Sequence, residues 1–79
     1  MKNNQFLEKL IYDTVVRNAY VLKVKQQMEE KYKIDNMPLD LVILYMQNFI
    51  RSIGGNNMQS AFIIGGIKDW FTEEVQLKY

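Results

Sequence analysis

The chain has 79 residues, a formal net charge of +1, and neither cysteine nor histidine. This length allows one domain, residues 1–79. The missing residue types exclude a disulfide framework and a structural zinc site, and they remove the commonest general base and the thiol nucleophile. Because the remaining carboxylates and hydroxyls form no recognisable catalytic or metal-binding pattern, we predict a non-enzymatic protein without a cofactor or metal.

Apolar residues are abundant for so short a chain: 48% of the residues are hydrophobic and 13% are aromatic. A small domain leaves much of its surface exposed, so we expect part of this apolar surface to be covered by a second copy or by another protein. The longest apolar runs fall far short of the ~20 residues that span a bilayer, and the opening segment, MKNNQFLEKL, lacks the apolar stretch of a signal peptide. We therefore expect a cytoplasmic protein.

The first predicted element is one long helix over residues 4–33, where apolar residues recur at spacings of three and four. The segment AYVLKVK, residues 19–25, also alternates as a short strand would. Helix is favoured because a lone strand has no pairing partner, and a break near Asn18 stays open. Two acid-before-base pairs with helical spacing support the helix: Asp13–Arg17 and Glu29–Lys33.

A turn over residues 33–38, KIDNMP, separates this helix from a second one over residues 38–53. Asp and Asn favour local side-chain to backbone bonds in such a turn, and Pro38 suits the first turn of a helix. The second helix is apolar nearly all round its circumference. This pattern is typical of a helix that is buried on more than one side.

The segment GGNN, residues 54–57, predicts a helix stop followed by a new start. Either glycine can adopt the left-handed conformation that ends a helix, and either asparagine can cap the next one. Apolar spacing then predicts a third helix over residues 57–77.

The third helix contains AFIIGGIKDWF, residues 61–71, with Gly65 and Gly66 inside an apolar run. Glycine disfavours helix, so a structural reason for the pair is expected. Close packing against the first helix or a second copy is favoured. A bend or short loop that splits the helix, or a strand with a bulge, are the alternatives. A phosphate-binding loop is disfavoured because the wider glycine pattern is absent.

Trp70 and Phe71 are adjacent, and adjacent helical positions point about 100° apart. We expect one ring in the core and the other at a protein interface, where aromatic residues are enriched. The candidate interface comprises the following residues: Trp70, Phe71, Ile67, Gly65, Gly66, Met46 and Tyr20.

Nucleic-acid binding is the alternative function. A basic edge with Tyr20 and Tyr32 nearby could run along the first helix, formed by Lys23, Lys25, Lys31 and Lys33. The net charge is low for this class, because residues 1–33 carry +3 and residues 34–79 carry −2. As a groove-reading helix, residues 57–77 would be hindered by their acidic side chains.

Residues 62–70, FIIGGIKDW, resemble the aromatic-Ile-x-x-aliphatic-aliphatic-x-x-Trp pattern near the end of DnaD-like replication domains. The resemblance covers nine residues only, and Gly66 departs from it where the pattern has an aliphatic residue. It implies a replication-related partner.

Together these patterns predict an all-α domain with a long N-terminal helix, an apolar second helix and a third helix with a Gly-Gly notch, forming a homodimer or a complex with another protein. As its function we expect a small regulator, inhibitor or assembly adaptor that binds protein, of the kind found among bacterial or phage accessory proteins.

Overall fold

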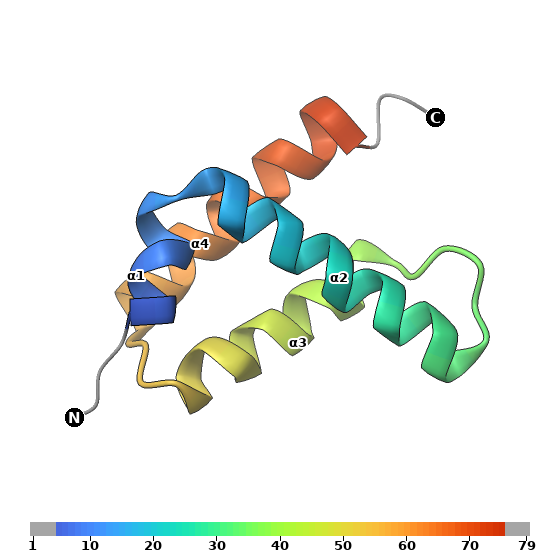
Figure 1. Ribbon diagram of the computed structural model, residues 1–79, viewed down its shortest axis with the longest axis horizontal. Helices are drawn as coiled ribbons and strands as arrows, with labels where there is room; N and C mark the ends of the chain where they lie inside the picture. The colour runs from blue at the N-terminus through green and yellow to red at the C-terminus, as the bar shows by residue number, and fades with distance from the viewer. Residues whose placement is uncertain (1–4, 76–79) are drawn as a thin grey trace.

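The computed structural model describes residues 5–75, whose regular elements are all helices; these residues contain no strand (Figure 1). The all-α prediction is confirmed, and the strand alternative for residues 19–25 is wrong because they lie inside a helix. The elements in chain order are α1 (Gln5–Tyr12), α2 (Thr14–Tyr32), α3 (Leu39–Ser52), α4 (Asn57–Trp70) and a π-helical turn η1 (Phe71–Val75). The end of the predicted third helix, residues 76–77, lies outside the described residues.

The predicted single helix over residues 4–33 is in fact two helices, divided at Asp13 rather than near Asn18. Asp13 has an extended backbone, and its carboxylate accepts a hydrogen bond from the Val16 amide at 3.2 Å. Asp is among the best N-cap residues, so it starts a new helix here instead of continuing the old one. The predicted Asp13–Arg17 pair is replaced by this cap, while the Arg17 Nε donates to Asn18 Oδ1 at 3.0 Å.

The core lies where the four helices meet, and α4 contacts each of the other three (Figure 1). Helical spacing brings one apolar stripe of each helix to this centre. The buried apolar residues are Leu7, Leu10, Val21, Val24, Met37, Val42, Ile43, Met46, Ile50, Ile63, Ile64, Ile67 and Phe71. An aromatic cluster joins α1, α2 and α3 beside them, with ring centroids 5.0 to 5.9 Å apart: Phe6, Tyr20 and Phe49.

The helix α4 runs unbroken through the Gly65–Gly66 pair, so the loop and strand alternatives are wrong. Close packing is confirmed at Gly66, where a Cβ would fall on the guanidinium of Arg17 from α2. Arg17 is itself buried, and desolvation lowers its pKa from the usual value. At Gly65 a Cβ would meet no atom within 4 Å. The two adjacent glycines therefore have different surroundings.

The two turns that join α2 to α3 and α3 to α4 are built differently. In the first, Lys33 takes a left-handed conformation, and the Glu29 carboxylate accepts from the Met37 amide at 3.0 Å and from Lys25 Nζ. Glu29 thus pairs with Lys25 instead of the predicted Lys33, and the bonds to Lys25 and Met37 lower its pKa.

The second turn confirms the predicted glycine stop and asparagine restart. Gly54 has a φ of 97°, and Asn56 forms a reciprocal capping box with Gln59.

Candidate functional site

An apolar surface lies between the C-terminal half of α2, the turn after it and the first half of α3. An open groove of about 480 Å³ is found there, and a smaller hollow of about 210 Å³ shares three of its residues. We call the two together the α2–α3 groove. The lining residues are Val24, Gln27, Met28, Lys31, Tyr32, Ile34, Met37, Leu41, Leu44, Tyr45 and Asn48.

The helix α3 creates this groove because it carries two apolar stripes and only one is covered. Val42, Met46 and Ile50 are fully buried, whereas Leu44 is 54% exposed and Tyr45 is 43% exposed. The prediction that this helix is buried on more than one side is wrong for the chain taken alone, since the other helices cover a single face. A contiguous apolar patch on a small protein marks an interaction surface more often than single exposed residues do.

The groove is nearly uncharged and has one basic edge. Lys31 is the single charged side chain among the lining residues, and its Nζ lies 5.4 Å from the centroid of the Tyr32 ring. Gln27 and Asn48 add amide groups at the margin. The lining contains no carboxylate or nucleophilic thiol, so its chemistry suits recognition of an apolar segment with a negative group beside it.

The predicted interface residues do not assemble in this groove. Met46, Ile67 and Phe71 are buried in the core, so they stabilise the chain and are not exposed to a partner. Trp70 is half-buried and packs edge-on against Phe71, with ring centroids 5.2 Å apart. Tyr20 belongs to the aromatic cluster, where burial raises its pKa with a smaller contribution from Tyr45.

Of the predicted glycines, Gly66 is covered by Arg17 while Gly65 is exposed on α4. The exposed apolar residues of the groove that the predicted interface does not include are Tyr32, Ile34, Leu41, Leu44 and Tyr45. The second apolar stripe of α3 was the available signal for three of them.

The four lysines of the predicted basic edge do not share one face. Lys23 and Lys25 are two positions apart on α2 and therefore point about 160° apart. Lys25 is engaged by Glu29, Lys31 lies over Tyr32, and Lys33 forms the helix cap. Their charges are thus spread around the end of α2 rather than concentrated on a stripe.

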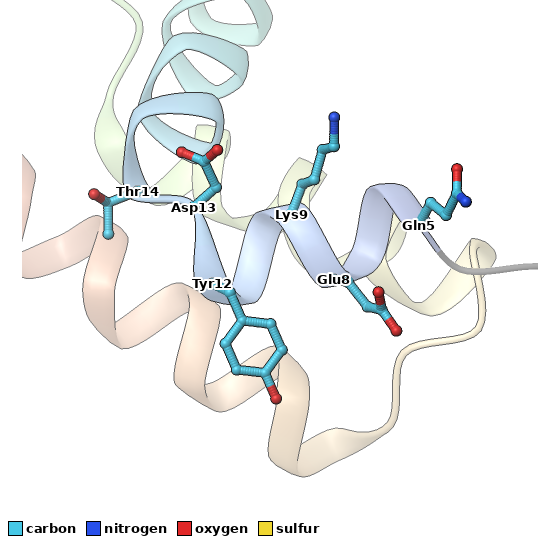
Figure 2. A pocket seen from close by; sticks show the side chains of 6 residues that line it. All are labelled: Gln5, Glu8, Lys9, Tyr12, Asp13 and Thr14. Atoms are coloured by element: carbon cyan, nitrogen blue, oxygen red, sulfur yellow. The ribbon is translucent and has the colours of Figure 1, made fainter.

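Another hollow, of about 630 Å³, follows α1 and is lined by residues with polar groups (Figure 2). Figure 2 shows Lys9 and Asp13 pointing to one side of the helix and Tyr12 to the other, so their functional groups do not converge on a ligand. Within residues 5–75 no cluster of three or more acidic side chains could hold a metal ion. None of the described helices is long and apolar enough to cross a membrane.

No protein-family model, curated protein or solved structure matches the chain. The nine-residue resemblance of residues 62–70 to DnaD-like domains gains no support from these comparisons.

Proposed function

We propose that the protein is a small non-enzymatic interaction module that binds an amphipathic helix of another protein in the α2–α3 groove. The observation that carries the proposal is the uncovered apolar stripe of α3 beside Tyr32 and Ile34. Covering this stripe would remove several large apolar side chains from water, at a gain of roughly 25 cal/mol per Å² of apolar surface before the cost of association.

A helix is the occupant that fits the shape of the groove. The groove is elongated along α3, because its lining residues Leu41, Leu44 and Asn48 recur at helical spacing on that element. A partner helix presents anchors at the same i, i+3/i+4, i+7 spacing, and such a helix in a groove is a recurring recognition mode. Lys31 favours a partner with an acidic residue beside its apolar stripe.

The proposal is tested with two synthetic amphipathic peptides of about four helical turns. Both carry the same leucine stripe, and one has glutamates while the other has lysines along its border. We expect the acidic peptide to bind more tightly by isothermal titration calorimetry, and its amide shifts to map to Leu41, Leu44 and Tyr45.

Matched substitutions decide whether the groove is the binding site. Leu44→Glu should weaken binding of the acidic peptide by about tenfold or more, because it places charge in the centre of the groove. Leu22→Glu is the control, since Leu22 is 45% exposed on α2 and does not line the groove. Equal effects of the two substitutions, or no binding of either peptide, would contradict the proposal.

A nucleic-acid function makes a different prediction, although the spread of the lysines gives it no specific support. Its affinity would fall steeply with salt, and changing Lys23, Lys25, Lys31 and Lys33 to Gln would abolish it. Apolar binding in the groove should instead persist at high salt, with only the modest contribution of Lys31 screened.

A further inference from the structure

The outer face of α4 carries apolar side chains that nothing within residues 5–75 covers. Met58 is 82% exposed and Phe62 is 63% exposed, and they lie one helical turn apart. Ala61 and Gly65 are exposed on the same side of the helix. This face is separate from the α2–α3 groove, because none of its residues lines the groove.

A hollow of about 400 Å³ borders this face at Ala61 and Gly65 and lies between α4 and the end of α3. Ala61, Ile64 and Gly65 form its apolar part. Its polar part comprises Asn57, Ser60 and Lys68 of α4 with Gln47 and Arg51 of α3. The hollow exists partly because Gly65 has no side chain, and a Cβ there would meet no other atom. A helical glycine is destabilising relative to alanine, and at Gly65, unlike Gly66, no contact within residues 5–75 accounts for it.

The geometry points to a second copy of this chain as the occupant of the α4 face. The two α4 helices cross antiparallel, and Phe62 of each copy enters the hollow at Gly65 of the other. A protruding ring and a hollow three residues apart on one helix are complementary to each other under a twofold axis. The same surface patch therefore serves both copies, and Gly65 allows the backbones to approach closely.

The charges along α4 favour the antiparallel arrangement. The last turn of α4 carries Lys68 and Asp69, and Glu73 and Glu74 follow in η1, so this end is acidic in sum. The first turn of α4 has no acidic residue and lies beside Arg51. An antiparallel crossing brings the acidic end of one helix to the positive N-terminal end of the other. A parallel crossing would place Asp69 against Asp69.

The dimer should be weak and concentration-dependent. A standard stable interface buries about 800 Å² per partner, which is about one-seventh of the 5606 Å² of this chain. The α4 face provides less than that unless neighbouring residues contribute.

Sedimentation equilibrium from low micromolar to millimolar concentration tests the inference. We expect the wild-type mass to rise from monomer to dimer, and Gly65→Leu and Phe62→Ala each to weaken the dimer by about tenfold or more. Gly65→Leu should also raise Tm, since leucine favours helix and the space is open. A loss of dimer with a gain in stability cannot be explained by unfolding.

Mixing the two variants tests the pairing itself. Gly65→Leu keeps its ring but fills its hollow, while Phe62→Ala keeps its hollow but lacks the ring. One ring and one hollow then match, so the mixture should form more heterodimer than either variant forms homodimer. A wild type that is monomeric at millimolar concentration, or a mixture that associates no better than its components, would overturn the inference.

The groove variant separates this inference from the proposed function. Leu44→Glu should leave the dimer intact, and Gly65→Leu should leave binding of the acidic peptide intact. A dimer lost in Leu44→Glu and kept in Gly65→Leu would mean that copies associate through the groove, and the α4 inference would fail.

Discussion

The two Gly-Gly pairs of the chain are identical in sequence but differ in backbone conformation and in the atoms that surround them. Gly54 ends α3 with a φ of 97°, and Gly55 lies against Ile50, to whose carbonyl its amide donates at 2.8 Å. Gly65 and Gly66 are ordinary helical residues inside α4. In the first pair only Gly54 has a backbone conformation that favours glycine, whereas neither glycine of the second pair has one.

The difference shows that a glycine in the same dipeptide can adopt a positive φ, allow another group to pack closely, or leave an empty space beside the helix. Gly54 is needed for its φ, Gly55 and Gly66 for the atoms that approach them, and Gly65 for neither within the described residues. Substitutions at the four positions should therefore change the free energy of unfolding by different amounts and in different directions.

Gly55→Ala should give the largest loss of stability, roughly 2 kcal/mol or more, because overpacking against fixed atoms is costly. The new Cβ would fall on the Ile50 side chain and lie 3.0 Å from the Ile50 carbonyl oxygen, which cannot rotate away. Urea unfolding measures the loss. Gly54→Asn is the matched control and should lose less, because asparagine tolerates positive φ. Equal losses of stability in the two variants would contradict the view that Gly55 is required for packing and Gly54 for its φ.

Gly66→Ala should destabilise by about 1 kcal/mol, because displacement of the buried Arg17 outweighs the gain in helix propensity. Its neighbour supplies the control: Gly65→Ala should stabilise by roughly 0.5–1 kcal/mol in dilute protein. In an Arg17→Met background Gly66→Ala should become stabilising, and the double-mutant cycle isolates this coupling. A Gly66→Ala variant that is stabilised in wild type would show that Arg17 moves aside freely.

The smallest effect concerns the turn that has no glycine. The folded pKa of Glu29 lies below its ordinary value of 4.5, so its contribution to stability is present above that pH and is lost as pH falls through the lowered pKa. We expect acidification to shift the amide signal of Met37, which donates to Glu29, more than that of Gly55, which donates to a backbone carbonyl. Glu29→Gln should abolish the Met37 shift, and an unchanged shift in that variant would contradict the assignment.

Local chemistry made much of the fold predictable from the sequence. Gly54 and Asn56 have side-chain and backbone preferences that act within a few residues, and the helix end and restart were predicted there. Asp13 has the same capping preference, but apolar spacing continues across it and concealed the break. The spacing of apolar residues indicates which face of a helix is apolar, but it does not indicate where one helix ends and the next begins in a new direction.

The candidate site was less predictable because the exposure of a side chain depends on which other helices pack against it. Leu44 and Met46 are both apolar residues of α3, yet one is open and the other fully buried. Only the arrangement of the other helices distinguishes them. Arg17 shows the reverse error, since a charge that suited a surface pair with Asp13 is buried against Gly66 of another helix, α4.

Because of the break at Asp13, the stability of α1 depends on its packing against the core and not on continuity with α2. A helix of eight residues is too short to persist alone in water, so α1 is helical because Leu7 and Leu10 are docked in the core. Undocking these two side chains unfolds α1 as a unit, without disturbing the cap that starts α2. Native-state hydrogen exchange should therefore find α1 opening before α2, α3 and α4, at a fraction of the global unfolding free energy.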